Sequence, residues 1–453
     1  MTKKSDRAGG GAYRLYVLAV LILIYTSNFI DRMILAVLGQ PMKQDLGLSD
    51  LQLGVLGGFA FAILYSTLGL PIAAAAERTK RVNVITAGLT VWSLMTAVCG
   101  LAANYGQLLA ARIGVGVGEA AFAPPSASLL SDYYPPERRA TALGLLSLGI
   151  PLGTIIGVLI GGYVSQHYGW RTAFFVVGVP GLLLAVLLRT TVREPLRGRF
   201  DQSAVEPAPS MAAAARRLFG KPAYLHVCLG AALTSFAAYG VTTFAIPYLM
   251  RGFGLSVAAA SVAFAVFGGL AAAVGVAAGG PLSDWLGRKD RRLYVLVPAA
   301  GLALAGPLFA LAFLQPTLKG LATFIVAPLV VQYLYLGPAA ALCQNMARPR
   351  ERALASAYLT LVINLIGLGL GPPLLGLASD LFASAAFSGG GDFQNACPGG
   401  QAPAGSAEVV GAACRAAAAT GLQRALVFAS AIYLWAALHF LLAARTLRRD
   451  LEV

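Results

Sequence analysis

The chain has 453 residues, of which 58% are hydrophobic and 12% are charged, and its mean hydropathy is +0.73. Soluble globular domains carry about 25% charged residues, so this composition excludes a soluble globule. A bilayer accepts about 20 apolar residues for each helical crossing. The sequence therefore predicts an all-α polytopic membrane protein with little room for a separate soluble domain.

Twelve apolar runs of span length follow one another along the chain. The first six lie at about residues 15–38, 51–75, 82–103, 108–131, 140–165 and 172–189. The second six lie at about residues 223–250, 257–282, 292–314, 319–346, 353–382 and 422–444. The first run is too long for a cleavable signal and contains Asp31 and Arg32, so we expect it to remain as a span.

The formal net charge is +15 with a pI near 9.8, and most of the basic residues lie in the even-numbered loops and the two tails. The positive-inside rule then places both termini in the cytoplasm, which requires an even number of crossings. Twelve crossings meet that requirement. We interpret the basic residues as an orientation signal and a contact with anionic membrane lipids, and we expect no nucleic-acid partner.

Two segments interrupt the series of spans. Residues 190–222 are rich in Arg and Pro and are predicted to form a cytoplasmic linker, in which MAAAARRLF at 211–219 is a candidate interfacial helix. Residues 383–421 contain GGGDF and are predicted to form a mobile extracellular loop. The linker separates an N-terminal six-helix bundle at 1–189 from a C-terminal six-helix bundle at 223–453.

The five cysteines divide into two groups. Cys99, Cys228 and Cys343 fall in spans, where we interpret them as small buried apolar residues. Cys397 and Cys414 fall in the predicted extracellular loop, where an oxidising compartment permits a disulfide. Their spacing leaves open whether they are bonded.

The two bundles echo each other in sequence. Glu77 in AAAAERTKR corresponds to Asp284 in GPLSDWLGRK at an offset of 207 residues. Arg139 in PERRATA corresponds to Arg352 in RERALAS at an offset of 213 residues. This repeat predicts two pseudo-symmetric bundles around a polar cleft, an architecture suited to exposing one site to alternate sides of the membrane.

Several motifs resemble those of the major facilitator superfamily. GGPLSDWLGRK at 279–289 resembles its loop motif, in which Gly, three residues and Asp precede Gly-Arg-Lys. ARIGVGVGEAAF, with Arg112, resembles its fourth-span motif, and the glycine series at 149–161 resembles its fifth-span motif. The N-terminal copy of the loop motif departs from the pattern, with Ala73 and Lys80 where glycines belong. The resemblance covers all twelve spans and implies the major facilitator fold.

A narrower resemblance is carried by YTSNFIDR at 25–32 and GEAAFAPPSASLLSDYYPPERRATALG at 118–144, which look like the spinster-like branch. That branch is associated with proton-linked movement of sphingosine-1-phosphate, lysophospholipids and related amphiphiles. The resemblance therefore implies a proton-coupled secondary active transporter that works by alternating access on an amphiphilic, lipid-like small molecule. Related branches share much of the fourth-span pattern, and the alternative is a proton-driven multidrug or organic-anion transporter of the same fold.

Four ionisable side chains lie clearly within spans, where each charge costs about 2.5–3.5 kcal/mol on insertion scales. They are Asp31 and Arg32 in the first span and Arg112 and Glu119 in the fourth. At about 1.5 Å per residue, Asp31 and Arg112 are expected at similar depths, with Glu119 about 10 Å deeper on the face of Arg112. Arg32 lies about 100° around the helix from Asp31 and is expected to reach polar groups of a neighbouring span or the outer headgroups.

We expect Asp31 and Glu119 to carry protons, with Arg112 as their switching partner. Burial favours a protonated carboxyl and a nearby guanidinium favours the carboxylate, so a change in distance from Arg112 would move a proton. The alternative is a fixed ion-pair cluster that joins the first and fourth spans. The candidate substrate-binding residues are Asn28, Arg32, Arg112, Glu119, Tyr239 and Tyr333.

The loop-motif residues Asp284, Arg288 and Lys289 are expected to latch the cytoplasmic side through charge contacts. The other candidate gating residues are Glu77, Arg78, Arg139 and Arg352. The alternative is that these charges only set the orientation in the membrane. The glycine series at 149–161 has four-residue spacing and is expected to allow close helix packing.

Other classes of protein lack their signatures in this sequence. No P-loop occurs, and the Gly-x-Gly-x-x-Ala run at 116–121 follows no strand, so no nucleotide site is expected. The three histidines do not cluster with Cys or acids at metal-ligand spacing, and we expect no enzymatic activity, metal or cofactor. The excess of Arg over Lys and the abundance of Ala are typical of a GC-rich genome and favour a bacterial inner membrane. We expect the protein to be a monomer.

Overall fold

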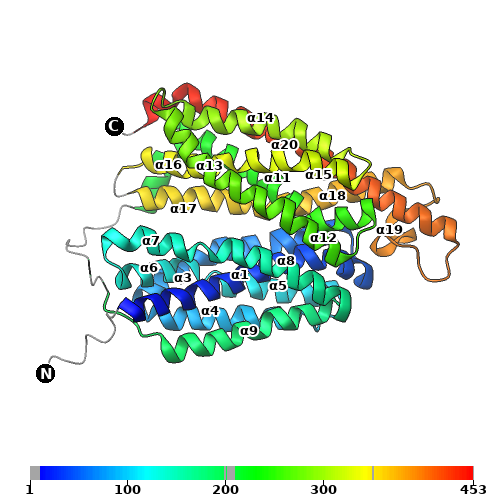
Figure 1. The fold of residues 1–453 in the computed structure, drawn as a ribbon, viewed down its shortest axis with the longest axis horizontal. Helices are drawn as coiled ribbons and strands as arrows, with labels where there is room; N and C mark the ends of the chain where they lie inside the picture. Colours follow the sequence, from blue (N-terminus) through cyan, green and yellow to red (C-terminus); the bar gives the residue numbers. More distant parts are fainter. Residues whose placement is uncertain (1–10, 198–199, 201–209, 349–350, 452–453) are drawn as a thin grey trace. The chain divides into compact units, whose positions relative to one another are not determined.

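The computed structural model describes residues 11–197, 200, 210–348 and 351–451. Every regular element in these ranges is a helix, which confirms the predicted all-α fold class (Figure 1). Ten helical segments of the described chain are long and apolar enough to cross a membrane. The expected second and fourth spans are helices interrupted along their length, so the described chain is consistent with twelve spans.

The chain divides into two compact units, Met1–Pro41 with Ala60–Val205 and Met42–Phe59 with Glu206–Val453. The helices of the first unit are α1 (Gly11–Leu46, up to Pro41), α3 (Ala60–Arg78), α4 (Arg81–Cys99), α5 (Tyr105–Glu119), α6 (Ala123–Tyr133), α7 (Pro136–Leu146), α8 (Gly149–Tyr168) and α9 (Trp170–Thr191).

The second unit begins with the end of α1 and with α2 (Asp50–Gly54) and the π-helix η2 (Val55–Phe59). It continues with α10 (Met211–Phe219), α11 (Pro222–Phe253), α12 (Val257–Phe264), η3 (Ala265–Gly269), α13 (Leu270–Gly287), α14 (Leu293–Phe313), α15 (Leu318–Gln332), η4 (Tyr333–Tyr335), α16 (Leu336–Asn345), α17 (Arg352–Val362), η6 (Ile363–Leu368), α18 (Gly369–Ala386), α19 (Phe393–Ala396), η7 (Pro398–Gly400) and α20 (Glu408–Asp450).

Several spans begin and end at residues that satisfy the helix termini. The side chains of Asn104, Ser256 and Thr317 accept hydrogen bonds from backbone N–H groups in the first turns of α5, α12 and α15. Gly169 separates α8 from α9 with φ 85°, and Gly254 ends α11 with φ 66°. Both glycines adopt a positive φ that other residues rarely adopt, so these two helix ends are fixed by the sequence.

In the first unit α4 lies against α5 and α9, and Figure 1 shows α4 and α9 running alongside one another. The buried core includes Trp92, Phe122 and Tyr133. The predicted close packing of the glycine series is present between α8 and α1. A Cβ on Gly153 would meet the Thr26 backbone oxygen at 2.4 Å, and one on Gly157 would meet Ile30 Cα at 2.9 Å.

In the second unit α20 packs against α11, α14 and α18. The rings of Phe309 on α14 and Tyr433 on α20 stack with their centroids 5.1 Å apart. The candidate interfacial helix is present as α10, and it lies against α11 and α17. The Tyr358 hydroxyl donates to the Met211 backbone oxygen at 2.8 Å, and Arg217 pairs with Glu351. Through these contacts α10 is joined to the second unit.

Helix interruptions recur at matching places in the two halves of the sequence. The π-helix that starts at Val55 in the second span is repeated 210 residues later at Ala265. The break after Glu119 in the fourth span has a counterpart 214 residues later at Tyr333, where a 3-10 turn separates α15 from α16. These offsets agree with those of the sequence repeat, and such bulges commonly mark functional positions.

The predicted loop at 383–421 is largely helical, so its assignment as a loop is wrong over much of its length. The helix α18 continues to Ala386, and α20 begins at Glu408, fourteen residues before the expected start of the last span at 422. Between them lie α19 and η7. Sequence composition failed here because the Ala-rich run after Glu408 has few large apolar residues, although Ala has the highest helix propensity.

Candidate functional site

The four predicted intramembrane charges all lie in the first unit, on α1 and α5. Asp31 and Arg32 lie on α1, and Arg112 and Glu119 lie on α5. Asp31, Arg112 and Glu119 are 0%, 2% and 1% exposed, and the Arg32 side chain is 21% exposed. Three of the four side chains are therefore removed from the surface of the unit, which is costly for charges unless they are paired.

The direct ion pair in this cluster joins Arg32 to Glu119. Arg32 Nε donates to Glu119 Oε2 at 2.8 Å. The sequence predicts Arg112 as the switching partner of Asp31 and Glu119, and it predicts that Arg32 reaches polar groups of a neighbouring span or the outer headgroups. Arg32 on α1 does reach Glu119, at the end of α5.

The other members of the cluster have unsatisfied polar atoms. Both carboxyl oxygens of Asp31 are buried with no hydrogen-bond partner among the described residues, as are Nε and Nη1 of Arg112. The amide nitrogen of Asn28 and Oε1 of Glu119 are also buried without a partner in the described chain. Native proteins satisfy most buried polar groups, so this concentration of unsatisfied atoms makes the cluster the candidate site of the first unit.

Arg32 is surrounded by aromatic rings. Its guanidinium carbon lies 5.1 Å from the ring centroid of Phe29, 4.8 Å from that of Phe61 and 4.9 Å from that of Tyr65. Aromatic faces attract a guanidinium, and a planar guanidinium can stack on them. Sequence analysis missed this arrangement, because Phe61 and Tyr65 belong to α3 and only the fold brings them to Arg32.

The fourth span breaks directly after Glu119. Helix α5 ends at Glu119, a turn follows, and α6 begins at Ala123 with Pro124 and Pro125 in its first turn. Proline has no backbone N–H, so these two residues cannot donate to the preceding turn as a continuous helix requires. Glu119 therefore occupies a helix terminus inside a span, the kind of interruption at which transporters place their binding sites.

Glycines beside the charges allow neighbouring helices to approach α5. A Cβ on Gly118 would meet the Trp92 backbone nitrogen at 2.5 Å, and a Cβ on Gly116 would meet the Phe61 backbone oxygen at 3.1 Å. The glycines of the fourth-span motif thus fix the packing of α3 and α4 around Arg112 and Glu119.

The predicted substrate residues Tyr239 and Tyr333 lie in the second unit, and both are half-buried. Tyr333 begins the turn that interrupts the tenth span. Its neighbour Gln332 accepts a hydrogen bond from the Tyr433 hydroxyl at 2.5 Å, and Ser235 and Tyr335 share a hydrogen bond of 2.8 Å. Neutral polar groups therefore surround this interruption, whereas charged groups surround the one after Glu119.

The predicted gating residues of the second unit are exposed. Asp284 Oδ1 accepts a hydrogen bond from the Tyr294 hydroxyl at 2.7 Å, and Lys289 Nζ lies 5.5 Å from the Trp285 ring centroid. Next to them is an open pocket of about 480 Å³, lined by Gly287, Arg288, Lys289, Asp290, Arg291 and Arg448. The Arg292 backbone N–H and the Arg448 guanidinium donate to Asp290 and hold the pKa of its carboxyl below the usual value.

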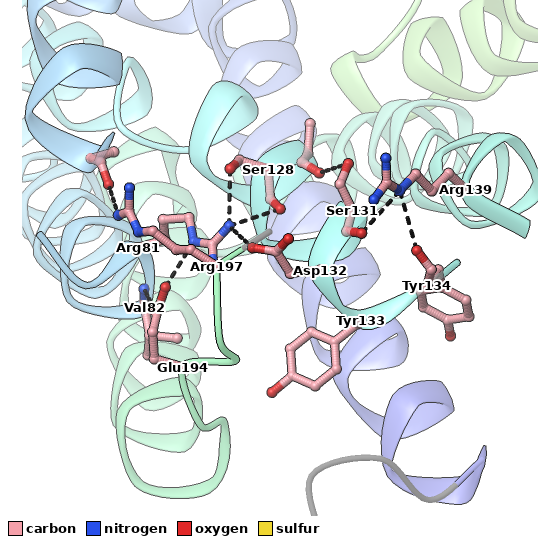
Figure 2. Close-up of polar contacts among 12 residues, drawn as sticks. Arg81, Val82, Ser128, Ser131, Asp132, Tyr133, Tyr134, Arg139, Glu194 and Arg197 are labelled. Carbon is pink, nitrogen blue, oxygen red and sulfur yellow. Dashed lines mark hydrogen bonds and ion pairs between the residues drawn. The ribbon is translucent and has the colours of Figure 1, made fainter. Parts of the chain in front are cut away.

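The remaining gating candidates are distributed over both units. Arg139 Nε donates to the backbone oxygens of Ser131 at 3.0 Å and Tyr134 at 3.2 Å, as Figure 2 shows. Arg78, at the end of α3, is exposed, and so is Arg352 at the start of α17. The Glu77 side chain lies outside the described part of the chain.

A charge network in the first unit was missed by sequence analysis. Arg81 at the start of α4 donates to Asp132 Oδ2 at 2.6 Å and to Glu194 Oε1 at 2.7 Å (Figure 2). Arg81 Nη1 also donates to the Ser128 backbone oxygen at 2.9 Å, and Glu194 accepts from the Val82 N–H at 3.0 Å. The signal in the sequence that could have indicated this network is Arg81, the last residue of the degenerate loop motif. Arg81 is buried, although the turn that it follows is exposed.

Cys397 and Cys414 form a disulfide, with their Cα atoms 5.6 Å apart. These are the two cysteines that lie in the predicted extracellular loop. The bridge joins η7 to α20, and Phe393 and Ala418 pack beside it. Cys99, Cys228 and Cys343 are buried with free thiols, as expected for residues within spans. Among the described residues, no group of three or more His, Cys, Asp or Glu could hold a metal ion.

The helical spans and the buried charges define a multi-pass membrane transporter. The sequence profile of the Major Facilitator Superfamily matches residues 21–372. The chain therefore belongs to the Major Facilitator Superfamily, and its fold is the one that the loop and span motifs imply.

Individual relatives agree with the spinster-like resemblance. The chain is 35% identical to a bacterial homolog of the human lysosomal transporter Spinster, whose crystal structure is inward-facing and unoccupied; the TM-score is 0.91, over 98% of this chain and 100% of that one. It is 33% identical over 363 residues to an MFS-type efflux pump of Mycolicibacterium smegmatis, covering 80% of this chain and 83% of the pump. It is 25% identical over 413 residues to probable sphingolipid transporter spinster homolog 1 of Arabidopsis thaliana, covering 80% and 82% of the two chains.

Proposed function

We propose that this protein is a proton-coupled secondary active transporter that moves an amphiphilic, lipid-like substrate by alternating access. The observation that carries the proposal is the Arg32–Glu119 ion pair beside the unpaired carboxyl of Asp31, all within spans of one unit. Ionisable groups inside spans are expensive and are kept mainly for ion or proton pathways.

Glu119 and Asp31 would carry the protons. When Glu119 is protonated it loses its charge-assisted bond to Arg32, and the guanidinium becomes available to another anion. Both carboxyl oxygens of Asp31 are buried without a hydrogen-bond partner in the described chain, so an approach of Arg112 would compensate a charge on this carboxyl. The interruption after Glu119 gives α5 and α6 a place at which such a change can alter helix geometry.

The surroundings of Arg32 support an amphiphile as cargo. A guanidinium between Phe29, Phe61 and Tyr65 offers an anionic or zwitterionic headgroup a cation and an adjoining tail an apolar surface. A relative supports the same class, since spinster homolog 1 of Arabidopsis thaliana is a probable sphingolipid transporter. Asn28 and Arg112 would supply further polar contacts within the first unit. In the second unit, Tyr239 and Tyr333 are the candidate substrate-binding residues.

A multidrug transporter is the second candidate. It is favoured by the MFS-type efflux pump of Mycolicibacterium smegmatis, which matches 80% of this chain at 33% identity. The same acids would serve proton exchange, and the aromatic rings around Arg32 would bind a planar apolar drug.

We further propose that Asp284, Arg288 and Lys289 take part in closing the cytoplasmic side in part of the cycle, as do Glu77, Arg78, Arg139 and Arg352. The exposure of Asp284, Arg288, Lys289, Arg78 and Arg352 leaves these five side chains available for charge contacts. The distribution of basic residues supports cytoplasmic termini, and we propose that the protein is a monomer in a bacterial inner membrane.

Uptake into proteoliposomes under an imposed pH gradient tests proton coupling. We expect the purified protein to move a fluorescent lysophosphatidylcholine only with a gradient, and Asp31→Asn and Glu119→Gln to abolish the gradient dependence. Glu408→Gln is the matched control, because Glu408 is an exposed acid, 86% accessible at its side chain, and it should retain coupling. Unchanged coupling in both intramembrane variants would remove these acids from the mechanism.

The choice of cargo needs a separate assay. Lipids that co-purify with the protein are identified by mass spectrometry, and uptake of the enriched lipid is compared with efflux of the cationic dye ethidium. Gradient-driven flux of the lipid without flux of the dye supports the amphiphile, whereas the reverse result supports the multidrug alternative.

A further inference from the structure

A second buried ion-pair network lies within the second unit and is centred on Asp50. Asp50, the first residue of α2, accepts hydrogen bonds from Lys43 Nζ at 2.7 Å and from the two terminal nitrogens of Arg251 at 2.7 and 2.8 Å. The Ser379 hydroxyl donates to it at 2.6 Å. The side chains of Lys43, Asp50 and Arg251 are only 2%, 3% and 6% exposed.

Asp380 on α18 completes the network from the backbone side. Its carboxylate oxygens accept the N–H groups of Asp50 at 3.0 Å and Leu51 at 2.8 Å. A carboxylate at a helix N-terminus is favourably placed, because the first N–H groups of a helix have no partner within it. The network thus contains two cations, Lys43 and Arg251, and two anions, and it is balanced in charge.

Close backbone contacts join α2 and η2 to η6 and α18 beside the Asp50 network. A Cβ on Gly54 would lie 2.2 Å from the Pro372 backbone oxygen, and a Cβ on Gly58 would lie 2.4 Å from that of Leu368. A Cβ on Gly376 would lie 2.2 Å from the Asp50 backbone oxygen. Only glycine permits this approach, so α2 and η2 pack against η6 and α18 almost backbone to backbone.

The segment that carries Lys43 and Asp50 is bounded by two helix irregularities. Met42–Phe59 belongs to the second unit, although the residues on both of its sides belong to the first. Its beginning follows Pro41 inside α1, and its end coincides with the end of the π-helix η2. Proline removes a helical hydrogen bond and a π-turn loosens the regular pattern, so helices bend at both kinds of site.

We infer that Met42–Phe59 is a releasable latch, which closes the end of the bundle predicted to be extracellular. This segment must separate from α11 and α18 when the protein opens to that side. The inference rests on the proposed alternating access. Ion pairs suit a releasable contact because charges that separate into water regain their hydration. Apolar surface that becomes exposed to water gains no such compensation. Such a network also has two discrete states, paired and separated, rather than a continuum.

Thiol labelling tests the latch without substrate or pH gradient. The Thr243 side chain on α11 faces Gly57, whose added Cβ would lie 3.3 Å from Thr243 Cγ2, so the closed latch covers it. Thr243→Cys is combined with Arg251→Gln or with Asp380→Asn, and labelling by a membrane-impermeant maleimide is timed. We expect roughly tenfold faster labelling in both combinations than with Thr243→Cys alone, because the equilibrium shifts toward the released state.

Arg415→Gln is the matched control. Arg415 also pairs with an acid at 2.7 Å, but its side chain and that of Glu408 are 60% and 86% exposed. The labelling rate of Thr243→Cys should be unchanged by Arg415→Gln. Equal labelling rates in the Arg251→Gln and Arg415→Gln backgrounds would overturn the inference.

A cross-link tests the latch in a protein that keeps all of its charges. Gly57→Cys with Thr243→Cys would place two thiols in reach of one another, and oxidation should abolish gradient-driven uptake of lysophosphatidylcholine until a reductant is added. Each single substitution, treated identically, controls for the effect of the reductant on Cys397–Cys414. Undiminished uptake by the cross-linked protein would overturn the latch. If the unmodified protein does not move the lipid, the proposed function fails while the labelling assay still decides this inference.

Discussion

Arg32 on α1 and Glu119 at the end of α5 are 87 residues apart in the chain, yet Nε and Oε2 lie 2.8 Å from one another. Glu119 is fully buried at its side chain, whereas Arg32 retains 21% exposure. Arg32 is therefore the direct ion-pair partner of this buried acid, and it is the more exposed member of the pair.

Arg32→Met should destabilise the protein by about 3–5 kcal/mol, because it leaves the Glu119 carboxylate buried without its direct partner. Arg32→Lys should cost less, about 1–2 kcal/mol, since it keeps the charge but loses the planar group among Phe29, Phe61 and Tyr65. Denaturation of the purified protein in detergent, followed by tryptophan fluorescence, measures the order of the two variants. No loss in Arg32→Lys would show that the aromatic rings add nothing, and equal losses in the two variants would show that a retained charge alone does not compensate Glu119.

Gly153→Ala should destabilise the protein by about 1–3 kcal/mol through overpacking. The added Cβ would meet the Thr26 backbone oxygen at 2.4 Å and Phe29 Cβ at 2.6 Å, and would force α8 away from α1. Gly144→Ala on α7 is the matched control, because a Cβ there meets nothing within 4 Å. That variant should be stabilised by up to about 1 kcal/mol through helix propensity. Thermal melting of both variants against the parent checks the opposite signs.

Replacing both Cys397 and Cys414 with Ser should lower the free energy of unfolding by about 3 kcal/mol, as expected when a loop of this length is no longer closed. The parent should lose similar stability in dithiothreitol, and the double variant should be insensitive to it. Hydrogen exchange of peptides at 387–407 should quicken in the variant. A parent melting temperature that does not respond to reductant would contradict the structural role of this bridge.

Arg81→Gln should cost about 3–5 kcal/mol, because Asp132 and Glu194 would be left together without their shared cation. Arg78→Gln, three residues earlier and exposed, should change stability by less than about 0.5 kcal/mol. The two variants differ by the same atoms from the parent, so a difference in melting temperature reports the network alone. Matching melting temperatures would mean that the network contributes no stability.

Asp290→Asn should leave the pH dependence of transport between about pH 5 and 8 unchanged. The pKa of Asp290 is lowered by the Arg292 N–H and Arg448, so the carboxyl is ionised throughout that interval. A carboxyl whose pKa is lowered by folding stabilises the native state at any pH above its pKa in the unfolded chain. That stabilisation is lost only as the pH falls through the pKa of the folded protein, which lies well below this range. Initial rates over a pH series check this, with Glu119→Gln as the variant expected to alter the profile.

Much of the fold follows from the order of apolar runs, because each span must satisfy its own backbone in lipid and therefore must be helical. The helix at 211–219 was predictable for a related reason, as its apolar and basic residues alternate with the helical period. Its position at the membrane interface stays a prediction. The segment after Glu408 was mistaken for a loop, since hydropathy reports insertion in lipid and not helix formation by Ala-rich sequence.

Within the site, hydropathy found Asp31, Arg32, Arg112 and Glu119, because a charge inside an apolar run is conspicuous. It did not find Arg81, Asp132 and Glu194, which lie at the ends of different spans and resemble ordinary flanking charges until the fold joins them. Hydropathy did not identify Asp50 and Arg251 for the same reason, although these two residues are buried together.

The sequence by itself determined that the spans are helical and which charges lie within them, because insertion into a bilayer is a local property of each run of residues. The tertiary structure decided which charge compensates which. Pairing depends on the approach of helices that lie far apart in the chain, and that approach is set by glycine contacts such as those of Gly118 and Gly153, whose partners no local pattern reveals.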